Sequence, residues 1–490
     1  MREVPSTIPD FLPATAEIFI LFSILLLMLI GVCKLNKSLD ILDYLAPCLT
    51  ICTLVVLFLL PENHTYTFSG SYINDQFAFV SKTFLLLSNF IILVLSKSVH
   101  KHENLKIFEI PILILFATLG MMMMISSSDI IIAFISLELT SLSLYILTAI
   151  DRNYKPASEA GIKYFTYGAI STAFFLFGLS FLYGITGSTH FDYIATDLSA
   201  LLLNKQDMTL AIIGILFITI SFMFKLGAAP FHYWLPDIYQ GTKLTITTLI
   251  ATTPKFAIFV LYVRFLTQIL PDFSYIWKPL LLIFSVLSVL FGTMGALRQK
   301  KIKRFLAYSG TMNIGFILLG VAQFTKAGLA AAGFYMFIYL VTIMGIFASL
   351  MYMKKKGFEI QNFDDLKGMS EQYPLLSFSF CLGIISLAGL PPLPGFIAKA
   401  YVLYAVLLEE HYFIAIFGVM STVIATAYYL NLLKSFMIDA VQKIYTQTAK
   451  QTGPTIKLII FSLITAILFI LLTPNIWIQI ANKTAIDLLH

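Results

Sequence analysis

The sequence predicts an all-α polytopic membrane protein with about 14 transmembrane helices. Three observations predict this class: the composition, the length of the apolar runs and the alternation of basic loops along the chain. Of the 490 residues, 59% are hydrophobic and 12% are charged, whereas about 25% of the residues of a soluble protein are charged. The bilayer is therefore the expected solvent of this chain.

Apolar runs that are long enough to cross a bilayer recur from one end of the chain to the other. A span needs about 20 apolar residues to cross roughly 30 Å of hydrocarbon. The runs are continuous and rich in Leu, Ile, Phe and Met, which favours helices over the period-two pattern of a membrane barrel. The predicted spans are, in order, 15–35, 41–61, 77–97, 107–126, 128–149, 160–186, 208–235, 244–268, 276–297, 303–323, 327–352, 374–405, 412–438 and 456–480.

Basic residues are concentrated in every second loop, that is, on one side of the predicted bundle. Twenty Lys and Arg side chains lie in loops that follow odd-numbered spans, against Lys205, Lys278 and Lys326 in the internal loops that follow even-numbered spans. Basic loops stay on the cytoplasmic or matrix side. Both termini are therefore expected on the opposite side, and the net charge of +6 does not predict nucleic acid as a partner.

The chain is expected to bind no cofactor of its own. It contains no G-x-G-x-x-G, no P-loop and no cysteine cluster, which are the motifs that hold nucleotides or iron–sulfur clusters. The first residues, MREVPSTIPDF, resemble neither a signal peptide nor a transit peptide, so no cleaved import signal is expected.

Two of the spans are predicted to be broken near mid-membrane, because a proline removes a backbone donor and clashes with the carbonyl four residues before it. Pro230 interrupts the seventh span, and Pro391, Pro392 and Pro394 interrupt the twelfth. Broken spans five helices apart indicate an internal repeat with an ion pathway at the breaks. Each repeat has an odd number of spans, so the second copy must be inverted. The predicted parts are a three-helix segment (1–106), repeats of helices 4–8 (107–270) and 9–13 (271–440), and helix 14 (441–490).

Four charged residues fall deep inside predicted spans: Glu138, Lys225, Lys255 and Lys399. A charge at the bilayer centre costs about 2.5 to 3.5 kcal/mol on insertion scales. Such residues are therefore expected to face the interior of the bundle, near water or near each other.

Three interpretations of the buried charges are open. Near the span ends, Lys82, Lys457 and Arg264 are expected to extend their charged groups to the interface. Glu138 and Lys225 could form a static ion pair that holds two helices together. The functional interpretation is a proton relay, because desolvation and a nearby carboxylate have opposite effects on the proton affinity of a lysine. Lys163 and His232 are weaker candidates for the same pathway.

Six stretches of the chain resemble one known family. The chain is similar to subunit 2, or subunit N, of the proton-pumping NADH:quinone oxidoreductases (respiratory complex I), through motifs that follow one another in family order over residues 110–440. These motifs are LELTSLSLYIL (137–147), EAGIKYFTYGAISTAF (159–174), FKLGAAPFHYWLPDIYQG (224–241), TTPKFAIF (252–259), RFLAYSGTMNIGFILLG (304–320) and LAGLPPLPGFIAK (387–399).

The resemblance implies an antiporter-like fold with two inverted five-helix repeats, and a place in the membrane arm beside sister antiporter-like subunits and membrane lipids. It also implies that Glu138 and Lys225 form the family's charged pair, that Lys255 is its central relay residue and that Lys399 is its exit residue; Lys163 and His232 match positions linked to the pathway. NADH, FMN, iron–sulfur clusters and ubiquinone would belong to partner subunits. One departure is GTKLTIT (241–247), which lacks the prolines that the family has before helix 8.

The sequence allows more than one cellular location and more than one class of function. Five Arg against 27 Lys, with 44 Phe, fit AT-rich coding, so the mitochondrial inner membrane is expected, with a bacterial plasma membrane as the alternative. The leading hypothesis is a proton-translocating subunit of complex I, which is an enzyme subunit without a redox centre. The alternatives are a subunit of a cation/proton antiporter complex without redox chemistry and a membrane scaffold that does not pump.

Overall fold

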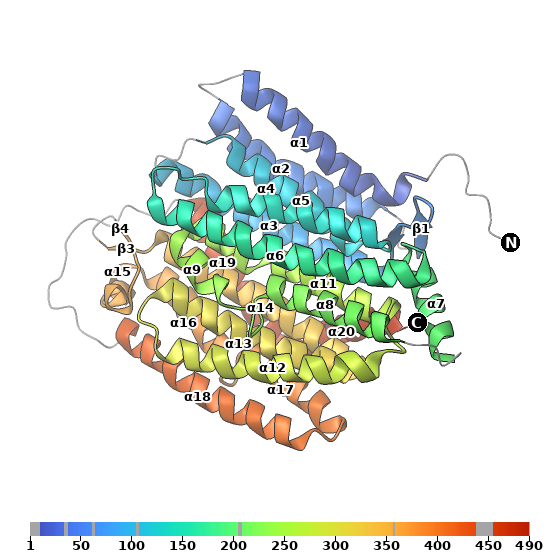
Figure 1. Ribbon diagram of the computed structural model, residues 1–490. Helices are drawn as coiled ribbons and strands as arrows, with labels where there is room; N and C mark the ends of the chain where they lie inside the picture. The colour runs from blue at the N-terminus through green and yellow to red at the C-terminus, as the bar shows by residue number, and fades with distance from the viewer. Residues whose placement is uncertain are drawn as a thin grey trace.

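The computed structural model describes residues 10–33, 38–60, 64–103, 107–203, 208–355, 358–437 and 454–489. Over these ranges the chain is almost entirely helical, and its long helices lie side by side (Figure 1). The first five helices are α1 (Thr15–Cys33), α2 (Ser38–Leu59), α3 (Gln76–Glu103), α4 (Glu109–Ile125) and α5 (Ile130–Thr148). The next are α6 (Lys155–Thr186), α7 (Phe191–Leu203), α8 (Thr209–Leu226), α9 (Trp234–Gly241), α10 (Leu244–Ala251) and α11 (Thr253–Gln268).

The second half of the chain continues the same bundle. Its helices are α12 (Ser274–Leu297), α13 (Ile302–Gln323), α14 (Lys326–Tyr352), α15 (Met369–Gln372), α16 (Pro374–Ala388), α17 (Pro394–Leu408), α18 (Tyr412–Met437), α19 (Pro454–Leu472) and α20 (Pro474–Leu489). Short 3-10 turns lie at η1 (Leu12–Ala14) and η2 (Phe363–Leu366), and two-stranded antiparallel hairpins form from β1 (Thr65–Thr67) with β2 (Tyr72–Asn74) and from β3 (Lys354–Lys355) with β4 (Phe358–Glu359).

The prediction of a polytopic helical membrane protein is confirmed. Within the described ranges, 11 helices are long and apolar enough to cross a membrane, and the bent pair α19–α20 raises the number to 12. The two other predicted runs, 107–126 and 374–405, contain shorter apolar helices. The count of 14, the inverted orientation of the repeats and the division into four parts stay predictions.

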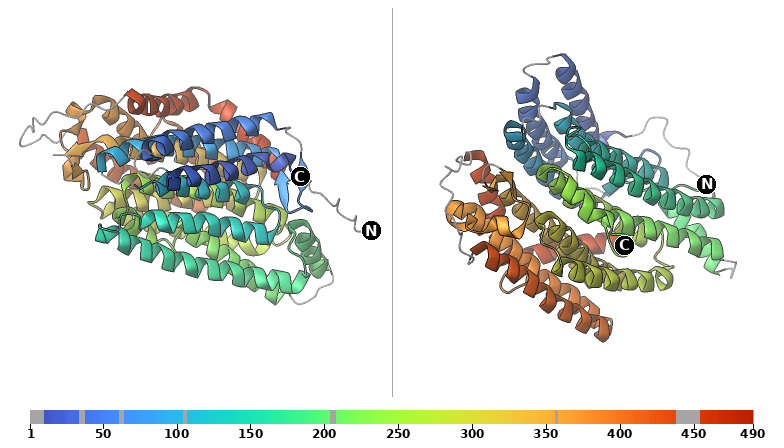
Figure 2. Two further views of the ribbon diagram at one scale, coloured as in Figure 1. Left: turned by 90° about the horizontal axis from the view of Figure 1, so that it is seen from above. Right: turned by 60° about the vertical axis from the view of Figure 1, so that its left-hand side comes forward.

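The helices form layers around a central group that is almost completely buried. The most apolar 18-residue stretch of the Leu244–Gln268 span is completely buried, and 94% of the corresponding stretches of α13 and of α14 is buried. The N-terminal helices cover one side of this group and α18 covers the other (Figure 1), as the right-hand view of Figure 2 also shows. The hairpin β1–β2 and α7 lie at one end of the bundle, and β3–β4 and α15 lie at the opposite end (Figure 1).

Both predicted helix breaks are present, and they are built alike. Gly227 caps the C-terminus of α8 and Gly389 caps that of α16, and each glycine has the positive φ (72° and 76°) that favours a residue without a Cβ. A cis proline follows each glycine, at Pro230 and Pro392. Helix α17 then begins at Pro394, whose missing N–H costs nothing at the first helical position.

Two further breaks lie where the sequence analysis expected continuous helices. Thr252, with φ −117° and ψ −92°, separates α10 from α11, and Pro254 follows it at the start of α11. The predicted run 456–480 is not one straight helix, because α19 and α20 meet at an angle of 84°. Pro474 begins α20 and cannot continue α19, since its ring clashes with the carbonyl four residues earlier.

Candidate functional site

Glu138 on α5 and Lys225 on α8 meet across α6. Lys225 Nζ lies 3.9 Å from Glu138 Oε1 and donates hydrogen bonds to Ser141 Oγ (3.2 Å) and Thr172 Oγ1 (3.5 Å). The hydroxyl of Thr172 donates to the same carboxylate oxygen at 2.6 Å. The two charges are therefore close, but the shorter contacts run through hydroxyl groups, which can both donate and accept protons.

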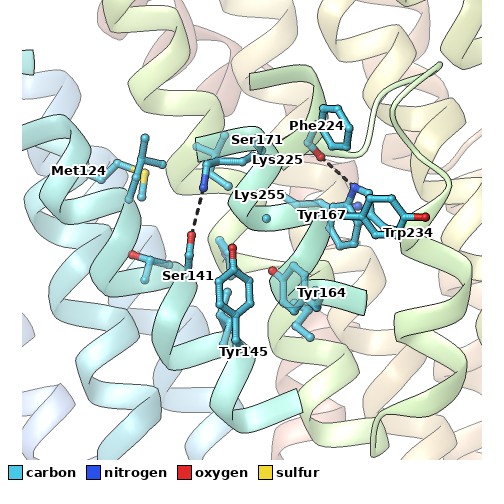
Figure 3. Close-up of a pocket in the computed structure, with 17 residues that line it drawn as sticks. Met124, Ser141, Tyr145, Tyr164, Tyr167, Ser171, Phe224, Lys225, Trp234 and Lys255 are labelled. Atoms are coloured by element: carbon cyan, nitrogen blue, oxygen red, sulfur yellow. Dashed lines mark hydrogen bonds between the residues drawn. The ribbon is translucent and has the colours of Figure 1, made fainter. Parts of the chain in front are cut away.

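A cavity extends from Lys225 toward Lys255. Its volume is about 30 Å³, and both lysines line it; a cavity needs about 10 to 15 Å³ measured in this way to hold a water molecule. Figure 3 shows Lys225 and Lys255 on neighbouring helices, with hydroxyl side chains in the same pocket. The polar groups in its wall include Thr140, Ser141, Tyr145, Tyr164, Tyr167 and Ser171. The cavity therefore has both the room and the polar partners that bound water requires.

Lys255 is the most isolated of the four charges. Its side chain is buried (1% exposed), and Nζ has no hydrogen-bond partner within the described part of the chain. The hydroxyls of Tyr239 and Tyr339 are also buried without partners there, and Nζ lies 5.7 Å from the Tyr239 ring centre. A Cβ at Gly310 would lie 2.9 Å from Tyr339 Oη and 3.6 Å from Lys255 Nζ. The missing side chain at Gly310 thus allows the Tyr339 hydroxyl to lie against α13, beside Lys255 Nζ.

Gly310 allows a test of whether this arrangement is used. If these groups carry protons, as the family resemblance implies, a Gly310→Ala variant is expected to slow proton uptake about tenfold. Its methyl group must displace the Tyr339 hydroxyl beside Lys255, and about 1.4 kcal/mol of barrier corresponds to tenfold in rate. Gly310→Ser is expected to retain most of the uptake, since its hydroxyl can donate and accept. Gly184→Ala is the matched control, because a Cβ there meets nothing within 4 Å. Equal loss in the Ala and Ser variants would contradict this role.

Lys399 lies at the second predicted break. Nζ donates to the carbonyl oxygens of Leu387 (2.8 Å) and Ala388 (3.1 Å), at the C-terminal end of α16. Helix C-termini carry unpaired carbonyls and partial negative charge, so they favour a cation. Lys225 likewise lies in the last turn of α8. The two breaks therefore place helix C-termini beside buried lysines.

Helix α13 connects the surroundings of Lys255 and Lys399. It passes Lys255 at Gly310, and Lys399 Nζ lies 5.7 Å from the ring centre of Phe316, six residues or about 9 Å further along the helix. Asn313 lies between these points. Its side-chain oxygen accepts from Tyr335 Oη at 2.7 Å and its amide nitrogen donates to Ser309 O at 2.9 Å.

The other two candidates, Lys163 and His232, lie apart from Glu138, Lys225, Lys255 and Lys399. Lys163 is 38% exposed and pairs with Asp237 Oδ2 (2.9 Å) and Glu159 Oε1 (2.8 Å). His232 is buried among aromatic rings, with those of Phe291 and Tyr308 about 6 Å away, and it is not among the residues that line the cavity of Lys225 and Lys255. The structure thus does not bring His232 to that cavity.

Asp237 joins three helices at this edge of the site. Its carboxylate accepts from Lys163 on α6 and from Arg304 on α13 (2.6 Å). Partial burial raises the pKa of the Asp237 carboxyl, but the hydrogen bonds and charges of Lys163 and Arg304 outweigh it and lower the pKa below its ordinary value. The ionised form is therefore the stabilising form.

Asp237→Asn is expected to lower the thermal stability of the assembled complex at neutral pH, by about 0.5 to 1 kcal/mol because the pair is partly exposed. The folded pKa lies below the unfolded value of about 3.9, so the stabilisation is fully present above that value and is lost as the pH falls through the lowered folded pKa. Melting curves from pH 3 to about 8 are expected to converge at the acid end. A difference that is independent of pH would contradict an electrostatic origin.

Two charged clusters near the N-terminal helices were not predicted. Arg264, on α11, forms a two-point ion pair with Asp75 at 2.7 and 3.0 Å, and both side chains are buried. Lys82 pairs with Glu17 at 2.6 Å and is fully buried. The expectation that Arg264 and Lys82 extend to the interface is therefore wrong, because each has a carboxylate partner within the bundle. Lys457 is exposed, and its extension to the interface stays a prediction.

Comparison with known proteins shows to which family this fold and this set of motifs belong. The family described as NADH:quinone oxidoreductase/Mrp antiporter, TM matches residues 127–425. The NADH-quinone oxidoreductase subunit N of Rhodospirillum rubrum is 35% identical over 475 residues, which cover 96% of each chain. That of Pelagibacter ubique is 37% identical over 88% of this chain and 90% of its own.

Solved structures agree with the sequence comparison. A chain of respiratory complex I from Thermus thermophilus has a TM-score of 0.80 and 25% identity, with 95% of this chain and 99% of that chain covered. A chain of the Mrp complex from Dietzia sp. has a TM-score of 0.81 at 19% identity, with 98% of each covered, which shows a shared fold. The expected antiporter-like fold is thus confirmed, and the chain belongs to the subunit N family of the NADH-quinone oxidoreductases.

Proposed function

We propose that this chain translocates protons across a membrane through a row formed by Glu138, Lys225, Lys255 and Lys399, in which Lys255 and Lys399 are buried and the Glu138 side chain is 24% exposed. The observation that carries the proposal is the cavity shared by Lys225 and Lys255, since it offers a polar path between two buried charges. Gly310 and Asn313 extend the polar surroundings toward Lys399. Charged side chains inside membrane spans typically mark ion or proton pathways.

In this proposal the Glu138–Lys225 pair works as a switch. A lysine that loses the favourable field of its carboxylate partner releases its proton more readily, and a lysine that regains the field binds one. The 3.9 Å separation and the hydroxyl groups of Ser141 and Thr172 allow the proton to leave Lys225 without first breaking a tight ion pair. The static pair is the alternative, and it predicts that the charge of Lys225 never changes.

The energy for translocation would come from partner subunits. Relatives of this chain are named subunits of NADH-quinone oxidoreductase, so we propose a place in the membrane arm of complex I, beside sister antiporter-like subunits. NADH oxidation and quinone reduction, with FMN, iron–sulfur clusters and ubiquinone, would take place in the partners, and this chain would bind none of these groups. The relatives named above are bacterial; the Lys- and Phe-rich composition supports the mitochondrial inner membrane, which membrane fractionation of the source cells would test.

Co-purification tests the proposal against its alternatives. The tagged chain is expected to isolate a complex that contains flavin and iron–sulfur clusters and acidifies vesicles when NADH is oxidised. A complex without redox groups that exchanges sodium for protons would favour the antiporter alternative. The fold shared with the Mrp chain is compatible with that alternative. Normal proton-to-electron stoichiometry after loss of Lys225 would favour the scaffold.

A further inference from the structure

A second cavity lies among α3, α11, α14 and α20, and the proposed relay does not use it. Its volume is about 60 Å³, twice that of the cavity between the lysines. No charged side chain lines it, and half of its wall is aromatic: Phe77, Phe84, Phe256, Phe259, Phe334, Phe337 and Trp477. We call it the aromatic groove.

The groove opens to the outside of the bundle along one stripe of α14. Between Gly328 and Met353, every residue with a described side chain is buried except Gly333 and Phe337, and both line the groove. They are four residues apart and therefore share one helix face. A Cβ at Gly333 would meet nothing within 4 Å.

Three aromatic rings close the end of the groove that is furthest from the N-terminus of α14. Phe337 lies 4.3 Å from Phe84 and 4.9 Å from Trp477, measured between ring centres. The Trp477 indole N–H is buried without an acceptor among the described residues, and the Thr484 hydroxyl in the wall donates to Ala481 O. Ser81 adds a second hydroxyl to the wall, but the other lining side chains are apolar and half of all the lining residues are aromatic, so these walls favour an apolar occupant.

Two lysines flank the lining residues of the groove along α14 and α20. Lys326 precedes Gly333 by seven residues on the same face of α14, about 10 Å further out, and Lys483 adjoins Thr484 on α20. Both lysines are exposed. They lie on the side of the membrane that carries few basic residues, where the Asp487 carboxylate accepts from the Phe77 N–H at 3.2 Å and so marks the start of α3.

We infer that the aromatic groove binds a short segment of one acyl chain of a membrane phospholipid, whose remaining length lies along the outside of the bundle and whose phosphate lies near Lys326 and Lys483. The walls belong to membrane-spanning helices, so lipid is present at the opening at high concentration. Each buried methylene contributes about 0.8 kcal/mol, and a phosphate near two lysines adds roughly 1 kcal/mol for each.

The bound acyl chain would contact α11 and α14, the two helices that carry Lys255 and Tyr339. Phe256 and Phe259 line the groove from α11, and Phe334 and Phe337 line it from α14. This consequence for the relay depends on the proposed function, whereas lipid binding itself does not.

The test is an electron cryomicroscopy map of the whole complex in nanodiscs of phosphatidylglycerol with dibrominated acyl chains. We expect elongated density with bromine scattering in the groove, and loss of that density in a Gly333→Leu variant, because the larger side chain fills the opening. Gly184→Leu, at another glycine without neighbours within 4 Å, is the matched control and should retain the density.

Three outcomes would overturn the inference: an empty groove in the unmodified complex, a neighbouring protein segment inside it, or unchanged bromine density in Gly333→Leu. The unmodified complex alone gives a decision, even if the variant fails to assemble. Proton uptake is measured on the same preparations, so lipid binding without pumping would reject the relay and leave the groove assignment standing.

Discussion

A Lys255→Met variant is expected to assemble and to lose proton translocation through this chain. Methionine is unbranched and flexible, so it can fill the buried space of the lysine stem, but it cannot carry a proton. Lys255 is the buried charge that lies between Lys225 and Lys399 in the proposed row. NADH-driven proton uptake by inverted vesicles should fall at least about tenfold, or the proton-to-electron ratio should fall, since removal of a proton-transfer group typically costs 10²- to 10⁴-fold.

Lys255→Arg separates proton transfer from simple charge. Arginine remains protonated in proteins, so it keeps the positive charge but cannot release the proton. The relay predicts that Lys255→Arg is as defective as Lys255→Met, whereas a scaffold that needs only a buried cation predicts normal uptake. Lys457→Met, at an exposed position, is the control for general effects of losing a lysine.

An Arg264→Met variant is expected to destabilise the chain by about 3 to 5 kcal/mol, because it leaves the buried Asp75 carboxylate without its partner. Burial raises the pKa of Asp75, but Arg264 outweighs this effect and lowers it, so the carboxylate is ionised at neutral pH. Asp75 also accepts from Ala78 N (2.7 Å) at the start of α3. The N-terminal helices should therefore detach more readily, with less assembled complex and a lower melting temperature.

The double variant Arg264→Met with Asp75→Asn tests this explanation. Asparagine carries no charge and is a good N-cap residue, so it can still accept from Ala78 N. Assembly should recover substantially relative to Arg264→Met alone. If the double variant is no better than the single one, the loss comes from packing around Arg264 and not from an unpaired charge.

The sequence predicted the membrane class and the proline breaks because both depend on local signals. Apolar run length and proline chemistry act within a few residues, so 227–233 and 389–393 could be identified as breaks. The contact of Glu138 with Lys225 was also expected, since two opposite charges in lipid need partners. Their role in proton transfer stays a prediction that the shape of the cavity supports.

The parts that were missed depend on residues far apart in the chain. Arg264 and Asp75 are 189 positions apart, and Asp75 looked like an ordinary loop acid, so nothing in the sequence indicated their pairing. Gly310 lies in an unremarkable helix, and its importance follows only from the side chains that surround it. The angle between α19 and α20 has a local cause, because Pro474 lies inside the predicted run 456–480.

The most direct test of the central claim is a map of the intact membrane arm at a resolution that shows water. The relay predicts ordered water in the cavity between Lys225 and Lys255, and between Lys255 Nζ and Tyr339 Oη beside Gly310. A map in which these spaces are dry, or in which the lysines point into lipid, would contradict it.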